Sequence, residues 1–512
     1  MTTLIVAPTP AAAEIGTPPE TRLRSPNVPA NRKVEQFAQA LVLAALLAGP
    51  ALMCLHAACV TDWDLWWHLR TGDWILAHGT VPRADSFSRA IAGKPWADYT
   101  WLFELLVDKL FLRFGLMGLV LYTVGMVLTI SCALFHLVRR LQSDFTLVVL
   151  LSFAASFSMQ HLYMPRPWLF TILFFVLVVD IVMQARRTGK IRELFWLPVI
   201  FAIWPNVHIQ FVAGLVVLAL ALVEAILARR GIDLPTCVAP GWMLGALTAS
   251  LLATCANPYG WHIYRTVYEL ATAPGGMDKI TELFAIPFRS LPDWCVLLFA
   301  MGATAALGKA GRLLPFETAL LTFAAYFSFR SQRDVWVLVV VAVAIVASSL
   351  PGRERARIRV PRSAAPLVLL ASLLMLVGGF RVLHADNRVL AHLLEQQMPV
   401  KAVEAVKERG YGGPLYNDYN WGGYLMWSLR LPVNIDGRGS LYGDQAIDTS
   451  SSTWGAGPDW DSDPQLRSAN MVIGPAMMPL SQVLRMESNW QLAYEDKVAA
   501  VFIRKARVPA RK

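Results

Sequence analysis

The sequence predicts a polytopic α-helical membrane protein of about eleven transmembrane helices, followed by a small C-terminal α/β domain. Of its 512 residues, 55% are apolar and only 16% are charged, and the mean hydropathy is +0.46. A soluble chain of this length needs more polar surface than this, so most of the chain must face lipid. Long apolar segments end near residue 384, and residues 385–512 alternate short β-rich runs with helical ones.

Residues 1–34 are rich in Pro, Ala and Thr and are predicted to be a disordered cytoplasmic tail. The apolar run at about 36–58 follows basic residues and lacks a clear cleavage site, which indicates a retained anchor rather than a signal peptide. Ten further apolar segments complete a transmembrane domain over 35–384. They lie at roughly 115–138, 144–160, 167–185, 192–205, 209–228, 241–256, 291–308, 313–328, 334–350 and 364–382.

Lys and Arg concentrate in alternate connections between these segments, as the positive-inside rule requires of cytoplasmic loops. The basic residues of the five predicted inside loops are Arg139, Arg140, Arg186, Arg187, Lys190, Arg192, Arg229, Arg230, Lys309, Arg312, Arg353, Arg355, Arg357, Arg359 and Arg362. This alternation places the N-terminus inside and puts the large loop 59–114 and the domain 385–512 outside. The net charge of +10 is therefore explained by the basic cytoplasmic loops of a protein in a lipid bilayer, and it indicates no nucleic-acid partner.

The domain at 385–512 is predicted to be a small extracytoplasmic α/β sandwich. A helix near 388–409 should end at Gly410, and the last two strands should form a hairpin around residues 495–497. The expected strands lie at 414–416, 432–435, 470–473, 491–495 and 498–504.

The first outside loop begins with a segment that is predicted to form one amphipathic helix over 61–79. Thr61 or Asp62 can cap its N-terminus, and Gly79 can close its C-terminus. Its aromatic face should lie in the membrane interface. The members of that face, at helical spacing, are Trp63, Trp67, Arg70 and Trp74.

Asp64 and His68, four residues apart, share another face of this helix. A carboxylate there could deprotonate an acceptor hydroxyl, or the pair of Asp62 and Asp64 could hold a divalent ion. The competing interpretation makes Asp62 only a cap, Asp64 a favourable charge at the helix dipole and the tryptophans an aromatic belt.

A second helix of the loop carries Asp98, Trp101, Glu104 and Asp108 at helical spacing. Glu104 is therefore a second candidate for acid/base chemistry, since these carboxylates could face one site. They could equally form the solvated side of a second interfacial helix.

Polar residues at the outer ends of other spans are candidates for binding a phosphate-linked sugar. Arg166 lies between two prolines, and Arg330 and Arg333 flank a predicted outer junction, where guanidinium groups suit phosphate. Asn206 and His208 interrupt an apolar sequence and, with Trp67, are candidates for substrate binding. The alternatives are arginines that snorkel to lipid headgroups and a histidine that serves only in packing.

The C-terminal domain has a further polar group after its predicted strands, where α/β domains bind ligands. It comprises Asn417, Asp418, Trp421, the Gly422-Gly423 pair and Asp436-Gly437-Arg438. Turn chemistry alone explains much of this pattern. The sequence contains no G-x-G-x-x-G, Walker A or G-x-S-x-G motif, so neither nucleotide binding nor a serine hydrolase is supported.

Several of these segments together resemble a known family. The stretch 64–75, DLWWHLRTGDWI, with Pro82-x-x-Asp85-x-Phe87-Ser88 and Pro95-Trp96, is similar to a group of bacterial proteins of the GT-C superfamily, as are 417–424 and 436–438. GT-C enzymes are membrane glycosyltransferases that take sugars from polyprenyl-phosphate donors. The resemblance covers nearly all of the chain after the tail and implies a GT-C-like fold in the bacterial inner membrane.

In that superfamily an acidic residue of the first outside loop is the usual catalytic base or metal ligand, which carries over to Asp62 or Asp64. The resemblance thus implies transfer of a sugar to a glycan, lipid or protein acceptor at the outer face, with Mg or Mn as the metal if one is needed. Two other classes of function compete with this one. They are a transporter or flippase of a lipid-linked saccharide and a non-catalytic scaffold whose outer domain binds glycans or a partner.

Overall fold

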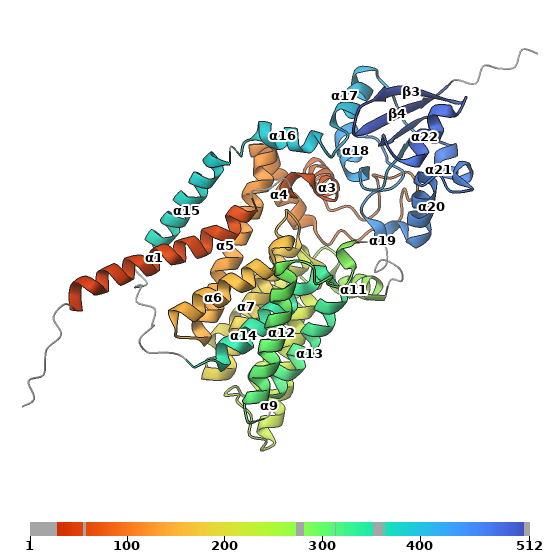
Figure 1. The fold of residues 1–512 in the computed structure, drawn as a ribbon. Helices are drawn as coiled ribbons and strands as arrows, with labels where there is room; N and C mark the ends of the chain where they lie inside the picture. Colours follow the sequence, from red (N-terminus) through yellow and green to blue (C-terminus); the bar gives the residue numbers. More distant parts are fainter. Residues whose placement is uncertain are drawn as a thin grey trace, which may run out of the picture.

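The computed structural model describes residues 28–54, 58–272, 281–312, 314–351, 361, 364–383 and 385–505. Most of the predicted tail and most of the basic loop 353–362 lie outside these ranges. The described chain is mainly helical. Most of its helices form a bundle, and the C-terminal sheet and its helices lie at one end of that bundle (Figure 1). The core bundle helices are α5 (Leu116–Leu141), α6 (Phe145–Ser158), α7 (Trp168–Thr188), α9 (Val212–Arg229), α12 (Leu291–Lys309), α13 (Pro315–Arg330) and α14 (Val335–Ser349).

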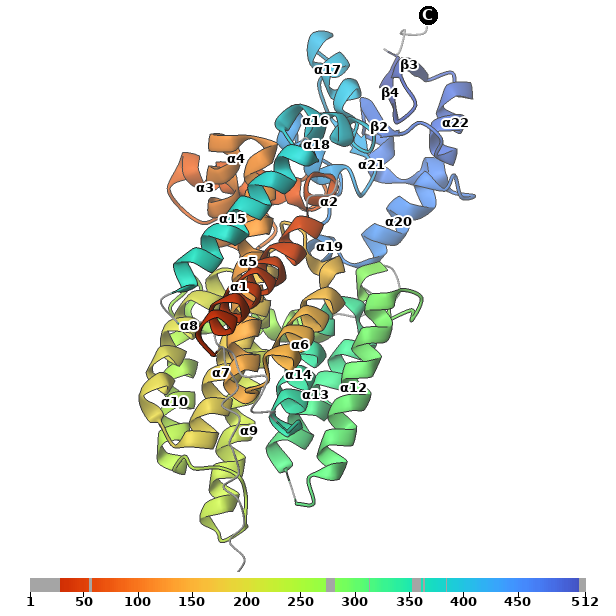
Figure 2. The same cartoon turned by 60° about the vertical axis from the view of Figure 1, so that its left-hand side comes forward.

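Two long helices, α1 (Val28–Met53) and α15 (Ala365–Val382), pair with each other along one flank of this bundle (Figure 2). On another side, α10 (Pro240–Ala253) packs between α8 (Leu197–Ile203) and α9. The exposed surface of α15 is rich in leucine, as expected of a helix whose outer face meets lipid.

Seven helical segments within the described ranges are long and apolar enough to cross a membrane. They are 33–53, 116–141, 168–188, 209–229, 291–309, 332–349 and 365–382. The other four predicted spans are also helical but shorter: they form α6, α8, α10 and α13, which have 14, 7, 14 and 16 residues. The polytopic helical architecture is therefore confirmed, while the segment 192–205 is broken into short pieces around Pro198 and Pro205.

The C-terminal sheet has four strands in the order β1-β2-β4-β3. β1 (Leu415–Asn417) runs parallel to β2 (Met471–Pro475), and β4 (Ala499–Arg504) is antiparallel to both β2 and β3 (Trp490–Glu495). Four of the five predicted strands and the terminal hairpin are thus confirmed. Successive side chains of the strands point to opposite faces of the sheet. One face joins the hydrophobic core of the bundle, and the other face packs with Trp454 and Leu480.

Two expectations for this region were wrong. The segment 432–435 is not a strand of the sheet, because Val433 makes only an isolated bridge with Ser88 of the first loop. The helix expected at 388–409 is two helices, α16 (Asn387–Glu395) and α17 (Val400–Glu408). Pro399 separates them, since proline cannot donate a backbone hydrogen bond and restricts the residue before it.

The first loop contains α2 (Ala58–Thr61), α3 (Leu65–His78) and α4 (Trp101–Phe114), so the single helix expected over 61–79 is interrupted at 62–64. Gly79 closes α3 in the left-handed conformation (φ 67°), as predicted. α3 and α4 lie at the same end of the bundle as the C-terminal sheet, beside α18 (Gly422–Leu429) (Figures 1 and 2).

α18 packs against part of the predicted aromatic face of the first loop, beside Trp63 and Trp67, while the contact of that face with the membrane interface stays a prediction. A Cβ atom on Gly423 of α18 would lie 3.0 Å from the backbone nitrogen of Trp67 and 3.1 Å from the carbonyl oxygen of Trp63. Only glycine permits so close a helix contact. On the adjacent face, Trp66 is buried against Tyr424 and Trp427 of α18.

Candidate active site

Arg166 brings the two acidic residues of the first loop together. Its Nε lies 2.5 Å from Oδ2 of Asp62, its Nη1 forms an ion pair with Oδ2 of Asp64, and its Nη2 lies 3.5 Å from Oε1 of Glu282. The arginine precedes α7, and its guanidinium lies 5.1 Å from the ring centre of Trp168. Three of the predicted site residues, from two distant segments, are therefore in direct contact.

The break between α2 and α3 positions these carboxylates. Oδ1 of Asp62 accepts hydrogen bonds from the backbone nitrogens of Asp64 (2.9 Å) and Leu65 (3.3 Å), so Asp62 caps α3 while its other oxygen binds Arg166. Asp64 makes no capping hydrogen bond. Its side chain is 24% exposed, against 2% for Asp62, so Asp64 is the carboxylate that a ligand can reach.

Burial and neighbouring charge shift the acidity of this cluster. Burial raises the pKa of Asp64, and Arg166 opposes that shift without cancelling it. For Arg166, burial alone would lower the pKa, but Asp62 and Asp64 reverse the effect and the net pKa is raised. The guanidinium therefore stays charged, and the Asp64 carboxylate is a stronger base than an exposed aspartate.

His68 does not share a site with Asp64 as predicted, because it turns inward to Glu104. Its Nδ1 lies 2.9 Å from Oε1 of Glu104, which also accepts a 2.9 Å hydrogen bond from the Thr100 hydroxyl. Burial lowers the pKa of His68, so the imidazole is neutral. Its ring stacks on Trp67 with the ring centres 3.6 Å apart.

Glu104 and Asp108 are buried and do not form the solvated side of a helix. Burial raises the pKa of Glu104 well above its usual value, and burial raises the pKa of Asp98 beside it to about 6. One oxygen of each of these two carboxyl groups is buried and makes no hydrogen bond within the described part of the chain. Glu104 is therefore placed to hold His68 inside the protein, and it lies beside Asp98 among buried groups rather than on an open face.

Asn206 and His208 lie in the connection before α9 and are both buried. Asn206 accepts from the Trp101 indole at 2.9 Å and donates to the carbonyl oxygens of Ala202 and Ala256, each at 2.8 Å. All of these contacts are internal, so Asn206 fixes the packing of α4 against the bundle. Nδ1 of His208 lies 2.9 Å from the Thr171 hydroxyl.

The structure separates the two arginines of the junction after α13. Arg330 is exposed, and its Nη1 donates to the Tyr326 hydroxyl at 3.5 Å. Arg333 instead lies near His208 and Tyr99. Burial and the positive charge of Arg333 lower the pKa of His208 to about 3. Burial raises the pKa of Tyr99, and the charge of Arg333 opposes that rise. Its Nε is buried and makes no hydrogen bond to any described residue. Arg333 is thus the arginine available to an anion.

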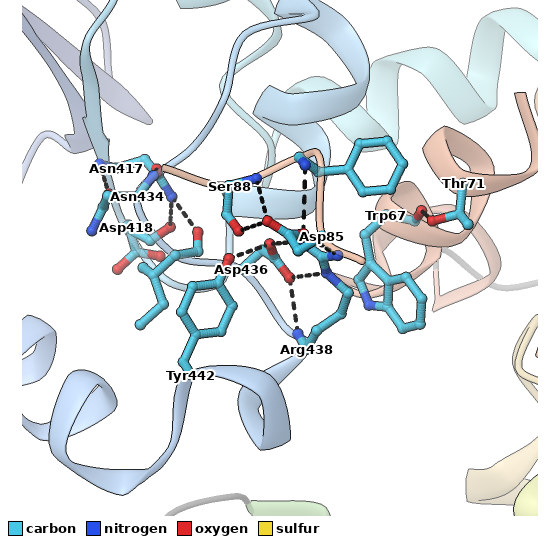
Figure 3. A network of polar contacts seen from close by, with 12 residues as sticks. Trp67, Thr71, Asp85, Ser88, Asn417, Asp418, Asn434, Asp436, Arg438 and Tyr442 are labelled. Atoms are coloured by element: carbon cyan, nitrogen blue, oxygen red, sulfur yellow. Dashed lines mark hydrogen bonds and ion pairs between the residues drawn. The ribbon is translucent and has the colours of Figure 1, made fainter. Parts of the chain in front are cut away.

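A second charged network joins the first loop to the C-terminal segment (Figure 3). Arg438 binds Asp436 through Nε (2.8 Å) and Nη2 (2.7 Å) and reaches Asp85 of the first loop at 2.7 Å. The Tyr442 hydroxyl donates to Asp436 at 2.6 Å, and the backbone nitrogen of Ser88 donates to Asp85 at 3.0 Å. This network holds the segment 436–438 against the loop.

Sequence reasoning did not identify Asp85, Asn434 and Tyr442 as members of this network. Asp85 could have been found from its turn signature, since its carboxylate accepts from backbone nitrogens two and three residues on. Asn434 pairs reciprocally with Asn417 through 2.7 and 3.0 Å hydrogen bonds. No local signal predicts that pairing.

The C-terminal segment also reaches Asp64 itself. A Cβ atom on Gly437 would overlap Oδ1 of Asp64 and lie 2.8 Å from its Cγ, so the backbone of 436–438 forms one wall of the carboxylate site. Tyr419 stands nearby: burial raises its pKa, and the charges of Asp64 and Asp436 add to that shift. The site is therefore built from the first loop, the turn before α7 and the C-terminal segment together.

The arrangement does not fit a divalent metal ion at Asp62 and Asp64. Both carboxylates bind the guanidinium of Arg166, which occupies the position between them. Within the described ranges, no group of three or more His, Cys, Asp or Glu side chains converges in a way that could hold a metal. Mg or Mn coordination usually requires several oxygen ligands around one point.

No protein-family model matches the chain, and no curated protein matches its sequence significantly. Among solved structures, the apo oligosaccharyltransferase of Archaeoglobus fulgidus matches with a TM-score of 0.52 and 11% identity, over 85% of this chain and 69% of that one. The same enzyme, AglB, in complex with an inhibitory peptide and a dolichol-phosphate gives the same values.

ArnT from Cupriavidus metallidurans in the apo state matches with a TM-score of 0.49 and 14% identity, over 92% of this chain and 98% of that one. The likeness to the oligosaccharyltransferase concerns the fold, because identity is low. It shows that the chain has a fold similar to that of this oligosaccharyltransferase, in agreement with the predicted polytopic helical architecture.

Proposed function

We propose that this chain is a membrane glycosyltransferase that moves a sugar from a polyprenyl-phosphate donor to an acceptor hydroxyl at the outer face of the inner membrane. The observation that carries the proposal is the cluster of Asp62, Asp64 and Arg166, in which one carboxylate is partly open. AglB, whose fold is similar, has been solved with a dolichol-phosphate, which supports a lipid-linked donor.

In the proposed reaction, the acceptor oxygen forms a bond to the anomeric carbon of the sugar as the bond from that carbon to the phosphate oxygen breaks. The acceptor proton passes to the Asp64 carboxylate, and the polyprenyl phosphate leaves with the bonding electrons. Asp64 suits the role of base because burial raises its pKa towards the working pH. Asp62 holds Arg166 and caps α3, so it keeps Asp64 in place.

The leaving phosphate is assigned to Arg333 first. Its buried Nε is free to donate, and a guanidinium keeps its charge in a cleft of low dielectric constant. Charge that develops on the leaving group is stabilised most by a preorganised cation. Arg166 adds a fixed positive charge nearby, while the exposed Arg330 is assigned to lipid headgroups.

The outer-face location rests on the distribution of basic residues. The basic pairs Arg139-Arg140, Arg186-Arg187 and Arg229-Arg230 lie at the C-terminal ends of α5, α7 and α9. Arg166 precedes the opposite, N-terminal end of α7, so the candidate site and the basic loops lie at opposite ends of that helix. By the positive-inside rule, this arrangement supports an outside location for the site and for the C-terminal segment that covers it.

The test is a transfer assay with the purified full chain and a panel of labelled polyprenyl-phosphate sugars. Asp64→Asn should lower the transfer rate by about 100-fold to 10,000-fold, the usual effect of losing a general base. Asp73→Asn is the matched control, since Asp73 is on the same helix but pairs with Arg70 and Arg430 outside the cluster. No transfer from any donor would favour a transporter or a scaffold, and equal rates in wild type and Asp64→Asn would remove Asp64 as the base.

A further inference from the structure

The guanidinium of Arg166 occupies the position that a cation would take between the first-loop carboxylates. We propose that Arg166 replaces a divalent ion there, so that Asp62 and Asp64 are organised by a covalently attached cation. The part of this proposal that concerns transfer rests on the proposed function. The part that concerns the occupied cation position stands on contacts alone.

The contacts divide the guanidinium among three carboxylates. Nε faces Asp62 at 2.5 Å, Nη1 faces Asp64, and Nη2 faces Glu282 at 3.5 Å. A divalent ion would need its oxygen ligands at about 2.0–2.6 Å around a single point, which the planar guanidinium already fills. The site thus has the acidic composition of a cation site and a cation already in it.

The surrounding chain fixes Arg166 in this position. Its side chain is only 9% exposed, it lies between Pro165 and Pro167, and its guanidinium lies 5.1 Å from the Trp168 ring. Its backbone carbonyl also accepts a 3.0 Å hydrogen bond from the Tyr122 hydroxyl. Two prolines restrict the backbone, so the arginine is preorganised and needs no rearrangement to hold Asp64.

A guanidinium differs from a metal ion in ways that can be measured. It stays protonated at any accessible pH, chelators cannot remove it, and it repels a second cation. Removing it leaves the carboxylates of Asp62, Asp64 and Glu282, which the guanidinium now holds apart, with no cation among them, and carboxylate oxygens are the ligands that Mg and Mn prefer. Arg166 is therefore a positioning residue whose loss should create a metal site that the wild-type chain lacks.

The experiment measures Mn²⁺ binding to the full chain in detergent by calorimetry and by the metal-dependent shift in melting temperature. Arg166→Ala should bind Mn²⁺ tighter than wild type by at least about 100-fold, because a unit positive charge in contact with the ligands is removed. Arg166→Lys keeps the charge and should bind no better than wild type. Adding Asp64→Asn to Arg166→Ala should abolish the gained binding, which assigns it to this site.

Two outcomes would overturn the proposal. One is Mn²⁺ binding to wild type that Asp64→Asn removes, and the other is transfer by wild type that is lost in a chelator and restored by Mn²⁺. If Arg166→Ala does not fold, Mn²⁺ binding to wild type and to Asp64→Asn still shows whether the wild-type site takes a divalent ion. If the chain transfers no sugar, the proposed function fails, while the Mn²⁺ measurements still report whether Arg166 occupies the cation position.

Discussion

Gly437 gives the sharpest test of how the C-terminal segment shapes the Asp64 site. A Cβ atom at this position would overlap Oδ1 of Asp64 and lie 2.8 Å from Cγ, closer than real carbon contacts allow. Gly437→Ala must therefore push the Asp64 carboxylate aside. The atom displaced is the end of a side chain, so the backbone need not move.

The two consequences of this displacement differ in size. Overpacking of this kind costs about 1–3 kcal/mol of stability, and the lower end is expected because a side-chain terminus can shift. Moving a catalytic group by about 1 Å can cost on the order of 100-fold in rate. Gly437→Ala should therefore lower kcat/KM for sugar transfer by about 100-fold while the melting temperature changes by a few degrees.

Two other glycines serve as matched controls. A Cβ atom on Gly422 would overlap the carbonyl oxygen of Ile435 and lie 2.7 Å from Cα of Asp436, so the obstacle there is backbone. Gly422→Ala should therefore lose more stability than Gly437→Ala. Gly412 has nothing within 4 Å of its Cβ position, and Gly412→Ala should change neither property appreciably.

The assay compares transfer rate and thermal unfolding across the three alanine variants. The expected pattern is loss of rate in Gly437→Ala, loss of stability in Gly422→Ala and neither in Gly412→Ala. Gly437→Ala that transfers sugar at the wild-type rate would refute the argument, because the base could then not lie against this backbone. An equal loss of stability in Gly437→Ala and Gly422→Ala would show that the contact is with rigid structure.

Arg333→Ala should raise the KM for the lipid-phosphate donor by at least about tenfold, while Arg330→Ala should leave it near wild type, because only Arg333 has a buried free donor; equal effects would contradict this assignment. Burial raises the pKa of Asp98 to about 6, so the folded state holds this proton more tightly than the unfolded chain. The contribution of Asp98 to stability should therefore fall as pH rises from about 4 to about 6, and melting curves of Asp98→Asn should lose that part of the pH dependence. Reporter fusions after residue 230 should read cytoplasmic and fusions after residue 400 external; a cytoplasmic signal at 400 would place the site on the wrong face.

Local patterns were enough to predict the helices of the bundle and most of the sheet. Apolar runs of helical length and alternating β-rich runs depend only on neighbours in the chain, so the segments that form α5, α7 and β4 were located to within a few residues. The interruptions were missed where a single residue broke a pattern. Pro399, which divides the helix expected at 388–409, is such a case.

Candidate site residues were predictable as a set, because charged groups at the ends of apolar spans are costly unless they have a role. Arg166 was identified in this way, and Asp62 and Asp64 were identified from their place on the first-loop helix and from the family resemblance, although more than a hundred positions separate the acids from the arginine. Their individual roles were not predictable. Helical spacing placed His68 beside Asp64, but the imidazole turns to Glu104, a partner that belongs to another helix.

The sequence by itself determined the class of protein, the distribution of its spans and the acidic and basic residues from which a site could be built, because composition and periodicity act locally. Only the tertiary structure decided which of them meet. It set Arg166 between two carboxylates, buried Glu104, and laid Gly437 on Asp64. Such contacts join segments that are far apart in the chain, and they depend on how whole helices pack, since a residue's own neighbours in sequence carry no record of the backbone that will lie against it.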